Sequence, residues 1–255
     1  MTLWEMVAVL AAGAGAGAIN AVVGSGTLIT FPVLLAVGLS PVTATVSNGL
    51  GLVPGALSGA FGYRRELAGQ RARVLRLGVV TGIGAVIGAA LLLTLPESAF
   101  EAVVPVLVGM ALVLVVLQPR ISRAVKRRHE RAGSRPHPEG GVPLLVGMGL
   151  ASVYGGYFTA AQGIIYLSLM GSLIDDTLQR LNAVKNVLAA IVNGVAAVFF
   201  LFVADFDWTA VLLIAVGSTL GALAGAAVGR RISPTVLRAV IVTVGTAALV
   251  QLIVR

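Results

Sequence analysis

Long runs of apolar residues alternate with short polar or glycine-rich breaks along the whole chain. A transmembrane helix needs about 20 apolar residues to cross the ~30 Å hydrocarbon layer of a bilayer, and several runs reach that length. The pattern predicts an all-α integral membrane protein. The apolar segments are residues 3–22, 26–38, 43–62, 74–95, 100–118, 142–158, 160–173, 183–203, 208–228 and 235–254.

The order of these segments divides the chain into two halves. The only long polar stretch, 119–141, separates an N-terminal half, 1–118, from a C-terminal half, 142–255, and each half has five segments. The second segment of each half, 26–38 or 160–173, is short and follows a break that contains glycine. Short interrupted helices are typical of transporters built from inverted-topology repeats. We therefore expect two such repeats, with broken or re-entrant helices near the membrane midplane.

Composition agrees with a membrane protein and excludes several chemistries. The 255 residues are 58% hydrophobic and 11% charged, whereas a soluble domain carries roughly 25% charged residues. The absence of cysteine excludes disulfides, thiolate metal sites and cysteine nucleophiles. The two histidines, His129 and His137, both lie in the polar stretch. We expect no metal, no cofactor and no enzymatic activity.

The net charge of +8 comes mainly from cations gathered in three short regions. The positive-inside rule places such regions in the cytoplasm, which gives a multi-pass protein of the cell (cytoplasmic) membrane. Nucleic-acid binding is the alternative explanation, and we favour orientation together with contacts to anionic membrane lipids. The basic regions are residues 63–76, 119–141 and 229–235, with Arg238 just beyond the last.

These regions also give the direction of individual helices. Segment 43–62 ends at Arg64, inside, whereas segment 183–203 ends near Asp205, outside. A constant offset of 138 residues superposes polar positions of the two segments, such as Asn48 on Asn186. Equivalent helices that run in opposite directions are the signature of an inverted repeat. The N-terminal stretch resembles a signal peptide in its apolar run, but it lacks a basic start, so we expect a retained first helix.

Lys185 is the strongest candidate for a substrate contact. A cation inside an apolar helix is energetically costly, so its presence there indicates a function. Amides share its face of the helix and can donate hydrogen bonds to an oxyanion. One alternative is that Lys185 reaches the cytoplasmic interface and pairs with Asp175 or Asp176. For the amides, the alternative is hydrogen bonding between helices. The polar stripe comprises Asn182, Asn186 and Asn193.

The other candidates lie at the two breaks and on the first half's third segment. Glycine-rich breaks can expose backbone N–H groups and a helix N-terminus to an anion, or they can simply allow close helix packing. Asp175 and Asp176 precede the lysine-bearing helix and would cap its N-terminus, with a proton relay as the alternative. The remaining candidate contacts are Gly24, Ser25, Gly26, Thr27, Asn48, Gly156, Tyr157 and Gln162.

Several strings resemble the sulfite exporter TauE/SafE family of the toluenesulfonate uptake permease group. In the first half these are GSGTLITFPVLLAVGLSP from Gly24 and GYRREL from Gly62. In the second half they are YGGYF from Tyr154 and RLNAVKN from Arg180, with the acidic pair between them. The stretch from Thr159 to Gln162 departs from the more glycine-rich family pattern, which makes Gln162 a candidate for tuning the substrate.

The resemblance implies a permease for sulfite, sulfoacetate or other organosulfonates, whereas the residues alone indicate a small anion. Alternating access would move one half against the other around the site. A non-transporting membrane scaffold or assembly factor and an anion channel are the rival functions. A coupling proton or ion, a homo-oligomer and the direction of transport are left open.

Overall fold

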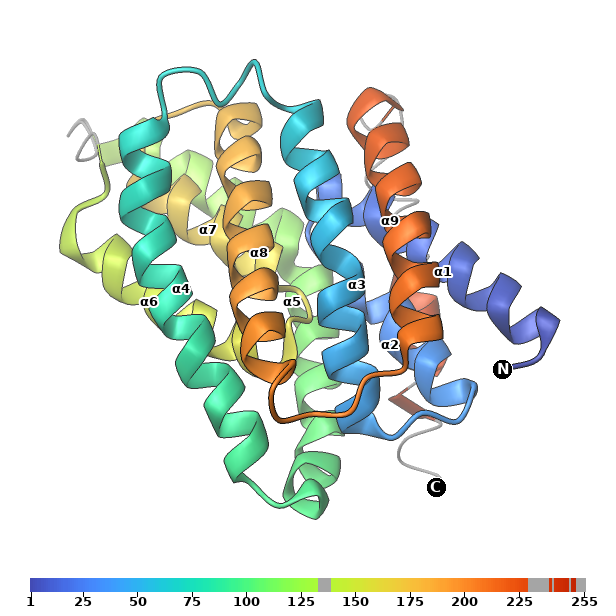
Figure 1. The fold of residues 1–255 in the computed structure, drawn as a ribbon. Coiled ribbons are helices and arrows are strands. Elements are labelled where there is room, and N and C mark those ends of the chain that lie inside the picture. Colours follow the sequence, from blue (N-terminus) through green and yellow to red (C-terminus); the bar gives the residue numbers. More distant parts are fainter. Residues whose placement is uncertain (133–138, 229–238, 240, 248, 251–255) are drawn as a thin grey trace.

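The computed structural model of the chain describes residues 1–132, 139–228, 239, 241–247 and 249–250 (Figure 1). Every regular element in these ranges is a helix, which confirms the all-α prediction. The tenth predicted segment is helical at each of its described positions. The continuous helices are α1 (Leu3–Val22), α2 (Thr27–Ala36), α3 (Pro41–Gly62), α4 (Arg71–Thr94), α5 (Glu97–Ala132), α6 (Gly141–Phe158), α7 (Gln162–Leu173), α8 (Leu178–Phe200) and α9 (Trp208–Val228).

Six described helices are long and apolar enough to cross a membrane: α1, α4, residues 98–121 of α5, α6, α8 and α9. The helices α2 and α7 have only 10 and 12 residues. At 1.5 Å per residue they are about 15 and 18 Å long, roughly half of the hydrocarbon layer. The short second segment predicted for each half is therefore present, and neither helix can span the bilayer alone.

Helix α5 extends further than the hydropathy pattern predicts. The predicted segment ends at residue 118, yet the helix continues through Pro119 to Ala132. Arginine, lysine, glutamate and alanine are good helix formers, so the loss of apolar residues marks the exit from the bilayer and not the end of the helix. Residues 133–138 of the predicted basic loop and the basic region 229–235 lie outside the described residues.

Small residues set the packing of the outer helices. Helix α1 packs along α9, where a Cβ added at Gly17 would collide with the backbone of Ser218. Helix α6 packs along α4 in the same way, with Gly88 against the backbone of Val153. Close backbone approach through small residues is a usual way for membrane helices to associate. The central α3 and α8 lie side by side between these two pairs (Figure 1).

Contacts at the ends of the helices show that α3 and α8 run in opposite directions. The loop that follows α3 meets the start of α8, because Gln70 Nε2 donates to the Arg180 carbonyl (3.1 Å) and Arg180 donates to the Ala68 carbonyl (3.2 Å). Near the other end, the Asp207 N–H donates to Ser47 Oγ in the first half of α3 (3.0 Å). We call residues 63–76 and 174–180 the basic end.

The packing has the order that two related halves would give. Exchanging the halves turns the α1–α9 pair into the α6–α4 pair and α1–α2 into α6–α7, and all four packings are present. The lengths of the short and central helices also correspond. Together with the opposite directions of α3 and α8, this agrees with an inverted repeat, which stays a prediction.

The prediction that Asp175 and Asp176 cap the N-terminus of α8 is wrong. Thr177 is the N-cap residue, and its hydroxyl accepts the Arg180 N–H (3.4 Å). Asp176 instead accepts the Thr177 N–H (2.8 Å) and pairs with two arginines. Since threonine caps a helix nearly as well as aspartate, the carboxylate is left for the stronger charged partners.

Candidate functional site

The breaks before α2 and α7 contact each other directly. The Gly163 N–H donates to the Gly24 carbonyl (3.1 Å), and a Cβ added to either glycine would lie 2.5 Å from the Cα of the other. Gly24 has φ +90°, a conformation that glycine adopts without steric cost. In the second break, Thr159 and Ala161 have φ of 53° and 56°. The chain therefore brings its two interrupted helices together at one point.

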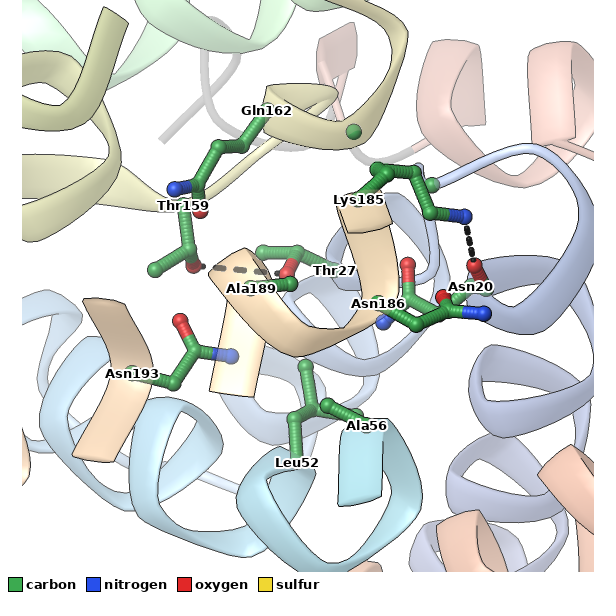
Figure 2. Close-up of a pocket in the computed structure, with 12 residues that line it drawn as sticks. Asn20, Thr27, Leu52, Ala56, Thr159, Gln162, Lys185, Asn186, Ala189 and Asn193 are labelled. Atoms are coloured by element: carbon green, nitrogen blue, oxygen red, sulfur yellow. Dashed lines mark hydrogen bonds between the residues drawn. The ribbon is translucent and has the colours of Figure 1, made fainter. Parts of the chain in front are cut away.

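A cavity lies beside this contact, between the C-terminal end of α1, the two breaks, α3 and α8 (Figure 2). It holds about 390 Å³ of space not filled by atoms, including the part open to solvent. The lining residues are Asn20, Gly24, Thr27, Leu52, Ala56, Thr159, Gln162, Gly163, Lys185, Asn186, Ala189 and Asn193.

Lys185 is buried on the cavity wall with 1% of its surface exposed. Its Nζ donates to the Asn20 carbonyl (2.5 Å), and no carboxylate of the described chain lies within 4.0 Å of it. The alternative in which Lys185 reaches the interface and pairs with Asp175 or Asp176 is therefore wrong. An ammonium has three N–H groups, so two remain for a ligand.

The amides of α8 bind the end of α1. Asn182 Nδ2 donates to the Ala21 carbonyl (2.7 Å), and Asn186 Nδ2 approaches the same oxygen at 3.4 Å. The last carbonyls of a helix have no partner within it and carry the negative end of its dipole. Hydrogen bonding between helices, the alternative for these amides, thus describes Asn182, while Asn186 also lines the cavity.

Asn48 acts on the cavity through threonine hydroxyls. Thr30 Oγ1 donates to Asn48 Oδ1 (2.5 Å), and Asn48 Nδ2 donates to Thr27 Oγ1 (3.3 Å). Thr27 Oγ1 lies 3.3 Å from Thr159 Oγ1, and both residues line the cavity (Figure 2). Because Asn48 donates into Thr27, the Thr27 proton points onward, either to Thr159 or into the cavity. In both cases one hydroxyl proton remains for a ligand.

A second chain of hydrogen bonds holds Gln162 in place. Its Nε2 donates to the Tyr166 hydroxyl (2.7 Å), which lies 2.5 Å from Ser152 Oγ. Ser152 in turn donates to the Met148 carbonyl (2.6 Å). Gln162 is 3% exposed. Its amide therefore has a fixed orientation on the wall of the cavity.

The sequence-predicted site residues fall into two groups. Lining the cavity are Gly24, Thr27, Gln162, Lys185, Asn186 and Asn193, whereas Ser25, Gly26, Asn48, Gly156, Tyr157 and Asn182 do not line it. Gly156 packs on the Ala85 backbone of α4, and the Tyr157 ring contacts the Phe100 ring at 5.4 Å. Successive residues of a helix point about 100° apart, so neighbours in a short motif need not share a face.

Sequence reasoning did not select several lining residues. They are Asn20, Leu52, Ala56, Thr159, Gly163 and Ala189. Asn20 could have been found as an amide near the end of an apolar helix; its Oδ1 accepts the Gly26 N–H (2.6 Å) and bridges the first break. The apolar members carry no such signal.

Charged groups at the basic end join the two halves. Asp176 lies 2.7 Å from Arg73 of α4 and 2.9 Å from Arg180 of α8. Burial would raise the pKa of Asp176, but hydrogen bonds from Arg73, the Thr177 N–H and Arg180 lower it below its ordinary value. Arg76 also pairs with Glu139 before α6 (3.1 Å). This network joins α4 to the start of α8 and to the segment before α6.

Comparison with known proteins gives the family. The profile described as "Sulfite exporter TauE/SafE" matches residues 9–252. The chain belongs to the sulfite exporter TauE/SafE family. It is therefore a multi-pass membrane protein of a transporter family.

Curated relatives carry matching descriptions. "Probable membrane transporter protein YfcA" of Escherichia coli (strain K12) is 26% identical over 82% of this chain and 75% of its own length. "Probable membrane transporter protein ORF9" of Sinorhizobium sp is 25% identical over 93% and 88%. A "Probable membrane transporter protein" of Haemophilus influenzae is 25% identical over 88% and 85%. No solved structure matches the chain significantly.

Proposed function

We propose that the protein is a secondary transporter of small sulfur-containing anions, such as sulfite and organosulfonates, by alternating access. The substrate binds in the cavity between the end of α1, the two breaks and α8. The observation that carries the proposal is the buried Lys185, which lines the cavity without a carboxylate within 4.0 Å in the described chain.

A buried charge that lacks a counter-ion is expensive, and a bound anion removes that cost. The rest of the polar lining suits the same ligand. Two N–H groups of Lys185 and one hydroxyl proton of the Thr27–Thr159 pair are free to donate. The N-termini of α2 and α7 start at the same place and add the positive ends of two helix dipoles.

The position of the cavity supports alternating access. It lies between elements of both halves, beside the point where the two short helices meet. A site placed where two repeats meet can be opened to one side or the other when one half moves. Under the positive-inside rule the basic end faces the cytoplasm of the cell membrane, and the network around Asp176 then closes the cytoplasmic side in this conformation.

Flux into liposomes tests the proposal. Lys185→Met keeps the apolar stem and removes the charge, so we expect it to abolish uptake of labelled sulfite and of ethanesulfonate. Arg65→Met is the matched control, because it removes a cation from an exposed position at the basic end. Reconstituted amount and size-exclusion profile verify that both variants insert and fold. Equal flux for Lys185→Met and the control would remove Lys185 from the site.

Two further readouts separate the rival functions. An anion that binds the folded protein raises its unfolding temperature in detergent by mass action, whereas a scaffold without a ligand shows no shift. Internal unlabelled anion accelerates uptake of labelled anion by a carrier through exchange. A channel shows no such acceleration.

A further inference from the structure

The cavity carries one ionisable side chain. Eleven of its twelve lining residues are neutral, and Lys185 is the twelfth. The nearest acids along the chain, Asp175 and Asp176, lie at the basic end, where Asp176 is held by two arginines. With Lys185 protonated, the formal charge of the lining is therefore one positive unit.

The neutral part of the lining has two faces. Thr27, Thr159 and Gln162 present hydroxyls and an amide near the breaks, whereas Leu52 and Ala56 of α3 lie on the other side, beside the amides of Asn186 and Asn193. Figure 2 shows Leu52 and Ala56 on the opposite side of the cavity from Gln162. The donors near the breaks can hold one oxyanion group, and Leu52 and Ala56 can contact a small uncharged substituent. The polar groups on that side are neutral amides, so a second anionic group would find no second cation in the lining.

We propose that the cavity selects anions with one negative charge over anions with two, and that Lys185 sets this number. The inference rests on the proposed function and narrows its substrate class. A monoanion and Lys185 neutralise each other, whereas a dianion leaves one buried charge without a counter-ion. Sulfite as its hydrogen anion and simple alkanesulfonates are then substrates. Sulfate and sulfoacetate, which carry two charges at neutral pH, are rejected.

Competition for uptake tests the selection on the full-length protein in liposomes. Unlabelled ethanesulfonate and sulfoacetate compete against labelled ethanesulfonate; they are similar in size and differ by the carboxylate. We expect the concentration of ethanesulfonate that halves uptake to be at least about ten-fold lower than that of sulfoacetate. Acidification that protonates the carboxylate of sulfoacetate is expected to bring the inhibitory concentrations of the two anions closer together.

A charge-adding variant makes the test specific for the site. Asn193 lines the cavity and its Oδ1 has no hydrogen-bond partner, so Asn193→Lys breaks no hydrogen bond of that oxygen and adds a second cation. We expect the variant to shift preference toward sulfoacetate and sulfate. Asn193→Leu, similar in size and uncharged, is the matched control and is expected to keep the preference for one charge.

The outcomes distinguish failure of the charge selection from failure of the proposed transport function. Equal competition by ethanesulfonate and sulfoacetate in the wild type would overturn the charge selection and leave the transporter intact. If neither anion is transported and neither raises the unfolding temperature, the proposed function itself fails. Should Asn193→Lys not fold, the wild-type competition and its dependence on pH decide the question.

Discussion

The contact between the two breaks makes a quantitative prediction about glycine. Replacing Gly24 with alanine would place a Cβ 2.5 Å from the Gly163 Cα, 2.9 Å from its carbonyl carbon and 3.3 Å from its nitrogen. All three are backbone atoms, which cannot rotate away as a side chain could. Gly24 also has φ +90°, so alanine is strained there for a second, separate reason.

Gly38 separates these two costs, because it has nearly the same φ without the contact. Its φ is +92°, and a Cβ added there meets nothing within 4 Å. Left-handed backbone costs an L residue roughly 1–2 kcal/mol, which both substitutions incur. Overpacking against fixed atoms adds about 1–3 kcal/mol or more, which only Gly24→Ala incurs. The difference between the variants should therefore be at least about 1–3 kcal/mol.

Thermal unfolding in detergent measures this difference. For a chain of this size, each kcal/mol shifts the unfolding temperature by roughly 2–4 °C. We expect Gly38→Ala to unfold a few degrees below the wild type and to transport normally. Gly24→Ala should unfold markedly lower still and lose transport. Equal unfolding temperatures for the two variants would refute the direct contact of the breaks.

Three further predictions concern other parts of the molecule. Asp176→Asn should lower the free energy of unfolding by roughly 2 kcal/mol near neutral pH, because two arginines lose a charged partner. Since the Asp176 pKa is lowered in the folded protein, its contribution is present above the unfolded pKa of about 3.9 and is lost as pH falls through the folded pKa. The free energy of unfolding should therefore fall less steeply with decreasing pH in the variant than in the wild type. Equal slopes for the two proteins would contradict the ion pair. Thr27→Val should weaken anion stabilisation of the protein several-fold, whereas Thr45→Val, a buried threonine outside the cavity, should not; equal effects would exclude the hydroxyl from binding. Gly49→Ala, where a Cβ meets open space within α3, should raise stability by about 0.5–1 kcal/mol, and a lower unfolding temperature would show that this position has an unseen neighbour.

Hydropathy predicts most of this fold because the bilayer leaves few alternatives to helices. The short second segments were visible as apolar runs too short to span, and they became α2 and α7. The end of α5 was missed for a physical reason. Hydropathy detects where a helix leaves the lipid, and a helix of charged residues can continue in water.

The cavity was harder to predict than the helices that form it. Lys185 could be selected from the sequence, because one cation in an apolar helix is an energetic anomaly. Leu52 and Ala189 could not, since an apolar residue on the cavity wall looks the same in sequence as one in the core. Asn48 was predicted to contact the substrate, but it does not line the cavity and instead donates a hydrogen bond to Thr27, which does. The packing of α2 against α3 decides that Thr27, and not Asn48, lines the cavity.

Lys185 also joins the two halves of the protein, which bears on how binding and movement are linked. Its Nζ, carried by α8, donates to the Asn20 carbonyl at the end of α1, and Asn182 holds the next carbonyl. A ligand shifts a conformational equilibrium only if it interacts differently with the two states. An anion that draws the ammonium toward the cavity competes with the Asn20 carbonyl and so acts on the contact between the halves. Under the proposed function, the side chain that binds the anion therefore also couples anion binding to the contact between α8 and α1.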